Sequence, residues 1–350
     1  MKNGVTAEVR RRRRRRLWTV AGTLLGLGAL GWVFGRLNYT RLLEVLAGAD
    51  AVFLMMLPLA IAAEQLVRAW KWRQILYPLR AVATLRLFGA VMAGYFGSLL
   101  VPLGVSPILR SWLIARLEAL SFSAVLASVA VDRLIDGIVF SGFVVAVLAF
   151  AVFPDPDGNI RLGLVIAGAA SFVAFVLMLV LLIRYRHDVA NEGSWIMRLA
   201  RRLPVRFAER GRAVLQAFAH GVAWPREPWR RMAVVLASIV LKLIAATHFL
   251  WAGLAFGVLL RPIDYLFLIV FLGFIVVLTH FARVAGGFIV GAVFALGLFG
   301  VEAERAVAMT LVVQVASIAT VAVIGAFALW RHGLSLADVR ATQSAGSRIG

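Results

Sequence analysis

Three charged side chains interrupt the long apolar segment 121–153: Asp132, Arg133 and Asp136. Asp132 and Asp136 are four residues apart and share one face of a helix, with Arg133 next to that face. Charges at membrane depth are costly, so they mark substrate paths and proton relays, or ion clusters that hold helices together. The spacing therefore indicates a counter-charge set for a polar headgroup, a proton-coupled switch or a structural ion cluster.

Two arginines lie beside segments rich in proline or glycine. Arg110 would open a short half-helix, where a guanidinium could hold a lipid phosphate through two parallel hydrogen bonds. The alternative is that Arg110 extends to a headgroup at the membrane interface. Arg283 lies beside Gly286 and Gly287, a pair that allows the backbone to turn sharply.

Further polar residues lie in other apolar segments. Glu64 and Arg68 are four residues apart and can pair on one helix face, either within the membrane or at its interface. Lys242, His248, His280 and Arg283 could line the outer half of a cavity whose inner half contains Arg110 and the charges of 121–153. A lone histidine, however, is more often a hydrogen-bond donor between helices. The chain has no cysteine, and its histidines lack a ligand spacing, so we expect no metal and no cofactor.

The composition belongs to a membrane protein. The 350 residues are 62% hydrophobic and 15% charged, against about 45–50% and about 25% in soluble domains. No nucleophile elbow, Walker loop or dinucleotide fingerprint is present, so we expect no enzymatic activity. We predict an all-α, polytopic integral membrane protein.

The apolar segments differ in length. They lie at 17–35, 51–69, 82–101, 106–120, 121–153, 162–183, 232–259, 265–282, 286–300 and 306–330. Because about 20 residues span the hydrocarbon core, 106–120 and 286–300 are too short to cross it. The segment 121–153 would be about 50 Å long as one helix, so we expect it to start outside the core or to break.

The net charge of +20 sets the orientation. Basic residues concentrate in the N-terminus 1–16, with seven arginines at 10–16, in 68–80, and in the loop 184–231. The segments 154–161 and 301–305 are mildly acidic. The positive-inside rule therefore places the basic segments and the tail 333–350 in the cytoplasm, with the transmembrane domain at 17–332 in the inner membrane.

The basic segments also predict partners. Beside a membrane anchor, the arginine run favours anionic phospholipid at the cytoplasmic face over nucleic acid. The stretch 195–220 is typical of an interfacial amphipathic helix. Six tryptophans fall at predicted span ends, as an aromatic belt requires. They are Trp18, Trp32, Trp70, Trp72, Trp229 and Trp330.

If every apolar segment crossed the membrane, these orientations would be inconsistent. A crossing at 82–101 would make 121–153 both begin and end outside the cell. The inconsistency disappears if two pairs of segments are re-entrant hairpins. The first hairpin is 82–120, with its tip at Pro102, Gly104 and Pro107. The second is 265–300, with its tip at Gly286 and Gly287. About six full spans then remain. Span, hairpin and span occur twice, which indicates either an inverted repeat of the transporter type or a chance similarity of apolar segments.

The sequence Val-Pro-Leu-Gly-Val-Ser-Pro-Ile-Leu-Arg at 101–110, followed by Asp132-Arg133-Leu-Ile-Asp136, resembles the lysylphosphatidylglycerol synthase transmembrane-region family. The resemblance covers about 50–330 and includes the glycine-rich segment from Gly286. It implies a flippase-like inner-membrane protein that handles lipid, as hopanoid-associated members do, with Arg110, Asp132, Arg133 and Asp136 as the functional set.

The chain departs from the family pattern in two places. Pro107 stands where the family usually has an acid, and no acid occurs between Asp264 and Glu302. Both departures make the predicted cavity more positive and disfavour a zwitterionic or aminoacylated lipid. Because the chain contains no aminoacyl-transferase domain, we do not expect it to synthesise lipid.

Two hypotheses follow. In the first, Arg110, Arg133 and Arg283 hold the headgroup of an anionic, polyprenyl-linked or hopanoid-type lipid that the protein translocates or presents. The counter-charges would be Glu64, Asp132 and Asp136. In the second, the protein is a non-transporting scaffold that recruits a lipid-modifying or glycosyltransferase enzyme through the loop 184–231.

Overall fold

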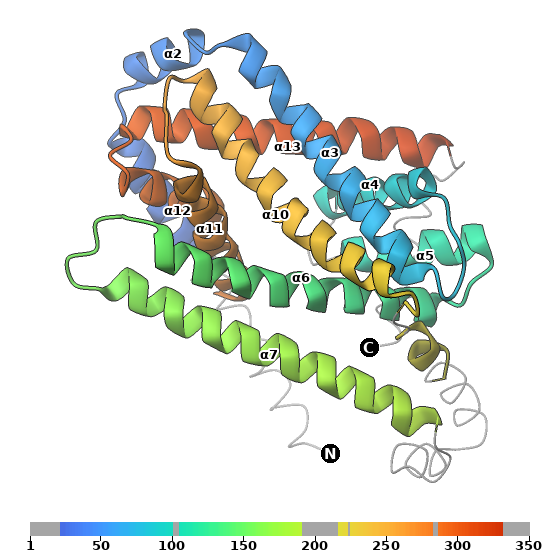
Figure 1. The fold of residues 1–350 in the computed structure, drawn as a ribbon. Coiled ribbons are helices and arrows are strands. Elements are labelled where there is room, and N and C mark those ends of the chain that lie inside the picture. The colour runs from blue at the N-terminus through green and yellow to red at the C-terminus, as the bar shows by residue number, and fades with distance from the viewer. Residues whose placement is uncertain (1–21, 101–104, 191–215, 223–224, 283–285, 332–350) are drawn as a thin grey trace, which may run out of the picture. The chain divides into compact units, whose positions relative to one another are not determined.

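The computed structural model describes residues 22–100, 105–190, 216–222, 225–282 and 286–331, and within these ranges every regular element is a helix (Figure 1). The bounds of the principal helices are α2 Tyr39–Ala47, α3 Ala51–Leu76, α4 Thr84–Leu100, α5 Val105–Glu118, α6 Phe122–Phe150, α7 Asn159–Ala190, α10 Pro228–Ala255, α11 Pro262–Ala282, α12 Gly287–Gly297 and α13 Ala303–Arg331. A further helix covers Gly22–Gly35. The predicted all-α class is confirmed.

Six of the described helices are long and apolar enough to cross a membrane: α3, α6, α7, α10, α11 and α13. The protein is therefore a polytopic membrane protein. The six helices are not the six predicted spans. Helix α11 corresponds to a predicted hairpin segment, yet it is long enough to cross the membrane. The predicted span 17–35 is described only from residue 22, and Gly22–Gly35 is shorter than a full span.

The long helix α6 does not break. Its 29 residues run without interruption from Phe122 to Phe150, which corresponds to about 43 Å at 1.5 Å per residue. Of the two predicted alternatives, the break is excluded, because the charged residues in the middle of the segment all keep helical backbone. A start outside the hydrocarbon core stays a prediction. The neighbouring helix α7 likewise extends to Ala190, so the residues joining it to α10 begin later than the predicted loop at 184.

The helices α4 and α5 pack against each other, as predicted for the first hairpin. Gly94 makes this contact possible, because a Cβ atom at Gly94 would lie 2.9 Å from the carbonyl oxygen of Ser106 and 3.2 Å from the Cβ of Arg110. Pro107 does not lie at the tip. It is the third residue of α5, in the first helical turn, where a missing N–H costs no hydrogen bond. Pro102 and Gly104 lie outside the described residues.

The helices α11 and α12 form a second packed pair. Gly286 precedes α12 with φ +73°, a left-handed conformation that glycine adopts without strain. Side chains at Gly286 and Gly287 would collide with Leu30 and Thr279, respectively. Gly286 therefore has the backbone conformation of a sharp turn, and Arg283 of the predicted tip lies outside the described residues.

The chain divides into two compact units. Unit 1 comprises 1–57, 143–167 and 246–315, and unit 2 comprises 58–142, 168–245 and 316–350. In unit 1, aromatic rings pack around Phe267, which contacts Phe153, Phe271 and Phe299. In unit 2, a buried apolar core surrounds Trp72 and includes residues of α3, α4, α5 and α6.

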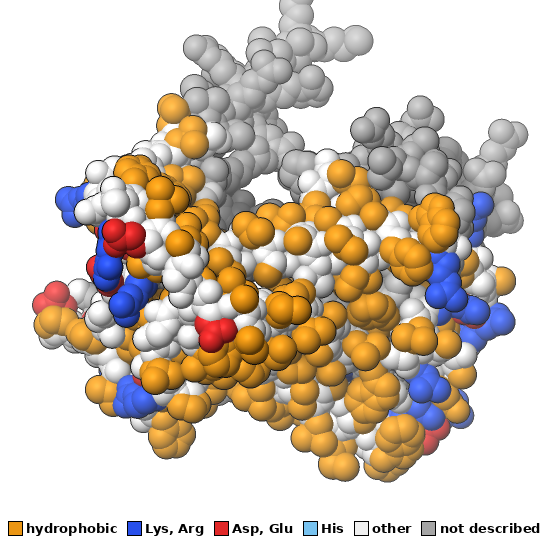
Figure 2. Space-filling view, turned by 90° about the horizontal axis from the view of Figure 1, so that it is seen from above, with side chains coloured by type: hydrophobic (Ala, Val, Ile, Leu, Met, Phe, Trp, Pro, Cys, Tyr) orange, Lys and Arg blue, Asp and Glu red, His pale blue; other side chains and the backbone are white. Residues whose placement is uncertain are grey.

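Large apolar side chains remain exposed along the long helices. On α7 they include Ile166, Val173, Leu177 and Leu181, each at least 52% exposed. Figure 2 shows hydrophobic side chains over much of the described surface on the side that it draws. Exposed apolar area of this extent suits lipid rather than water.

The described residues include part of the predicted interfacial helix and most of the predicted tryptophan belt. Of the predicted interfacial helix 195–220, only residues 216–220 are described, and they are helical. Among the tryptophans of the predicted belt, Trp32, Trp70, Trp229 and Trp330 are exposed, which agrees with the prediction. Trp18 lies outside the described residues. Trp72 is fully buried, so its assignment to the belt is wrong.

Candidate functional site

One face of α3 carries three charged residues of unit 2. The Nη2 of Arg68 lies 2.8 Å from Oε1 of Glu64, and the Nε of Arg68 donates to Oε1 of Gln65 at 3.1 Å. The predicted pair of Glu64 and Arg68 is confirmed, with both side chains nearly buried. Lys71 continues the same face because positions 64, 68 and 71 recur at the helical spacing. The charged side chains of this face are buried or nearly buried inside unit 2.

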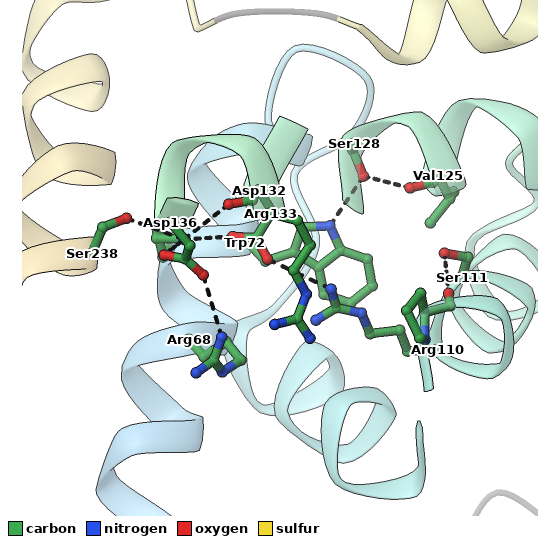
Figure 3. A network of polar contacts seen from close by, with 12 residues as sticks. Arg68, Trp72, Arg110, Ser111, Val125, Ser128, Asp132, Arg133, Asp136 and Ser238 are labelled. Atoms are coloured by element: carbon green, nitrogen blue, oxygen red, sulfur yellow. Dashed lines mark hydrogen bonds and ion pairs between the residues drawn. The ribbon is translucent and has the colours of Figure 1, made fainter. Parts of the chain in front are cut away.

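The carboxylates of α6 meet this face (Figure 3). The Nζ of Lys71 lies 2.7 Å from Oδ1 of Asp132 and 2.6 Å from Oδ1 of Asp136. It also donates to Oγ of Ser238 on α10 at 3.2 Å. Arg68 contacts the second oxygen of Asp136, with Nη1 and Oδ2 3.4 Å apart. A buried ion network thus joins α3 to α6, and Lys71 links it to α10.

Arg110 reaches the network from α5. Its side chain is fully buried, and Nη2 lies 3.5 Å from Oδ2 of Asp132. The guanidinium stands over the ring of Trp72, 5.1 Å from the centroid, while Nε1 of Trp72 donates to Oγ of Ser128. No guanidinium nitrogen of Arg110 has a hydrogen-bond partner among the described residues. Buried donors without acceptors are costly, so these nitrogens are available to an anion.

Arg133 occupies a different place from its neighbour Asp132. It is exposed, and its Nη2 donates to the hydroxyl of Tyr95 on α4 at 3.4 Å. Tyr95 is half-buried and interacts electrostatically with Arg68, Arg133 and Arg110. Arg133 and Tyr95 therefore form the accessible edge of the buried network.

Lys242 brings a further cation from α10. It lies on the same face as Ser238, one helical turn away, and its Nζ stands 5.4 Å from the ring centroid of Phe140. It interacts electrostatically with Asp136. Lys242 is half-buried at the side of the network that α10 covers.

These eight charged residues constitute the charge cluster, and all belong to unit 2. The cations are Arg68, Lys71, Arg110, Arg133 and Lys242, and the acids are Glu64, Asp132 and Asp136. Five cations against three carboxylates leave an excess of two positive charges among these residues. Since unpaired charge is costly at membrane depth, this arrangement suits an anionic group.

The structure places only some of the predicted site residues in the charge cluster. Glu64, Arg110, Asp132 and Asp136 are brought together, and Arg133 lies at the edge. Gly286 and Gly287 belong to unit 1, where Gly286 precedes α12 and Gly287 is its first residue. The positions of Arg283, Pro102 and Gly104 fall outside the described residues.

Lys71 and Tyr95 are functional candidates that the sequence did not predict. Lys71 was assigned to a cytoplasmic segment, 68–80, because that segment is basic. In the structure α3 continues to Leu76, and both Arg68 and Lys71 are buried in the charge cluster. The spacing of Lys71 from Glu64 and Arg68 was the signal that could have found it; Tyr95 had no such signal.

No metal site is apparent in the described part of the chain. No group of three or more histidine, cysteine or acidic side chains there could hold an ion. The carboxylates of the charge cluster are already engaged by arginine and lysine. The expectation that the whole protein needs no metal stays a prediction.

Fold and site together define a polytopic, all-α membrane protein that carries a buried, cation-rich cluster. The family model of the lysylphosphatidylglycerol synthase TM region matches residues 19–325, and the chain belongs to this family. The predicted resemblance is thereby confirmed. Comparison with curated proteins and with solved structures found no match.

Proposed function

We propose that this protein translocates an anionic lipid between the leaflets of the inner membrane, or presents it there, without enzymatic activity. The observation that carries the proposal is Arg110, whose buried guanidinium has no hydrogen-bond acceptor and belongs to a cluster with excess positive charge. Such a group attracts phosphate, which accepts two parallel hydrogen bonds from arginine. Membership of the lysylphosphatidylglycerol synthase TM region family also supports a role with lipid.

Arg133 and Arg110 would bind the headgroup one after the other. Arg133 is exposed and would meet the headgroup first, with Tyr95 beside it. Arg110 is fully buried and would receive the headgroup further inside. When the headgroup replaces Asp132 at Arg110, the carboxylate of Asp132 keeps its contact with Lys71 at 2.7 Å. The acids therefore stay paired with Arg68 and Lys71 in both arrangements and hold these two cations in place.

The first test is Arg133→Gln. We expect this variant to lower the rate of lipid translocation at least tenfold, because its exposed cation is the entry point of the headgroup. The measurement is dithionite quenching of fluorescent anionic phospholipid in proteoliposomes. Thermal stability should stay close to that of the wild type, because an exposed side chain held by one long hydrogen bond contributes little to folding.

Arg116→Gln is the matched control. Arg116 is also exposed and also lies beside an aromatic ring, that of Trp112, but it is outside the charge cluster. This variant should translocate lipid at the wild-type rate. A wild-type rate in Arg133→Gln would overturn the assignment. If deletion of 195–220 then abolished the cellular function, the scaffold hypothesis would replace this one.

The orientation has its own test, since the native chain has no cysteine. We expect a cysteine at Asp157 to react with an impermeant maleimide in intact cells, and a cysteine at Arg226 to react only after the cells are opened. Both native side chains are exposed, so access depends on the side of the membrane. The reverse pattern would contradict cytoplasmic termini.

A further inference from the structure

We infer that the charge cluster selects a lipid ending in a dianionic phosphate, a phosphomonoester or a diphosphate, over a phosphodiester or a zwitterion. The inference rests on the proposed function and adds the chemical class of the headgroup. It depends on three observations: the charge balance, the arrangement of arginines around Tyr95, and the engagement of every carboxylate.

The excess positive charge of the cluster sets how many negative charges the bound headgroup should carry. The cluster carries an excess of two cations, which a single phosphodiester with one negative charge would only half neutralise. A phosphomonoester carries about −1.5 to −2 at neutral pH. Because residual charge is expensive in a low-dielectric environment, the dianion is the better match.

The arginines come from three helices, and one of them, Arg133, donates to the hydroxyl of Tyr95. Arg68 of α3, Arg110 of α5 and Arg133 of α6 all interact with Tyr95 of α4. The hydrogen bond from Arg133 to Tyr95 is 3.4 Å long, beyond the usual 2.7–3.2 Å, and is therefore easily exchanged for a better acceptor. A terminal phosphate has three acceptor oxygens, which suits donors that approach from separate directions.

The acids exclude a headgroup amine. Glu64 lies 2.8 Å from Arg68, while Asp132 and Asp136 lie 2.7 and 2.6 Å from Lys71. No carboxylate of the cluster is left for the ammonium of a zwitterionic or aminoacylated lipid. Pro107, in the first turn of α5, adds no acid near Arg110. An ammonium entering the cluster would meet uncompensated positive charge.

The test compares fluorescent phosphatidic acid, phosphatidylglycerol and phosphatidylcholine in proteoliposomes of the wild-type chain. We expect phosphatidic acid to move at least tenfold faster than the other two. Its rate should rise from about pH 5 to about pH 7.5, because the second ionisation of a phosphomonoester lies near pH 6. Phosphatidylglycerol, a monoanion throughout, controls for titration of the protein. Equal rates for phosphatidic acid and phosphatidylglycerol would overturn the inference.

Lys242→Gln tests the charge balance directly. The variant lowers the excess from two to one, so the ratio of phosphatidic acid to phosphatidylglycerol rates should fall severalfold. Arg116→Gln, outside the cluster, should keep the wild-type ratio. An unchanged ratio in a folded Lys242→Gln protein would contradict the charge argument.

Three outcomes distinguish an error in the headgroup class from a failure of the proposed function. If phosphatidylglycerol moves as fast as phosphatidic acid, the proposed function stands and only the headgroup class is wrong. If no lipid moves, the proposed function itself fails. Uptake of radiolabelled inorganic phosphate by the same vesicles, without movement of phosphatidic acid, would show that the cluster serves a soluble phosphate and would overturn the lipid assignment.

Discussion

Asp132→Ala is expected to lower the free energy of unfolding by about 3–5 kcal/mol, the usual cost of removing one partner of a buried ion pair. Asp132 is fully buried and lies between Lys71 at 2.7 Å and Arg110 at 3.5 Å. Without it, Arg110 keeps its charge in the interior and loses its counter-ion, while Lys71 retains Asp136. Unfolding in SDS, followed by tryptophan fluorescence, measures the loss.

A double variant separates the ion pair from the rest of the site. Asp132→Ala combined with Arg110→Leu removes both charges, so much of the stability should return. Translocation should remain lost, because the group that receives the headgroup is absent. Asp157→Ala, which removes an exposed carboxylate outside the cluster, should unfold like the wild type. Wild-type stability in Asp132→Ala would show that the ion network does not hold the helices together.

Gly94→Val is expected to abolish translocation and to destabilise the protein by about 1–3 kcal/mol, the cost of overpacking a close contact. A Cβ at Gly94 would lie 2.9 Å from the backbone oxygen of Ser106 and 3.2 Å from the Cβ of Arg110. The backbone of α5 must therefore move away from α4. Since Arg110 sits on α5, its guanidinium moves away from Asp132 and Trp72. The dithionite assay and SDS unfolding measure the two effects.

Gly142→Val provides the control for the change in helix propensity. Gly142 lies within α6, and a Cβ there would have no atom within 4 Å. The same substitution at this open position should leave the rate of translocation unchanged. If Gly94→Val and Gly142→Val behaved alike, the close packing of α4 on α5 would not be what positions Arg110.

The sequence predicted the class of fold because hydropathy is a local property. An apolar segment of sufficient length forms a helix in lipid whatever its neighbours are, since its backbone groups must be satisfied within the segment. The spans α3, α6, α7, α10 and α13 were predicted in this way. The same reasoning gave Arg110, Asp132 and Asp136, because a charge within an apolar segment stands out by itself. The pairing of α4 with α5 was predicted from the charges of the connecting segments.

Only the tertiary structure decided which charges are buried and what they face. Lys71 belongs to a basic segment that the positive-inside rule assigns to the cytoplasm, yet it is fully buried between Asp132 and Asp136. Its partner Asp136 lies 65 residues further along the chain. Tyr95 likewise becomes a candidate only because Arg133 of another helix donates to its hydroxyl and Arg68 and Arg110 interact with it electrostatically. A local sum of hydropathy and charge contains no term for such partners, so the chain alone determined the helices and their packing determined the site.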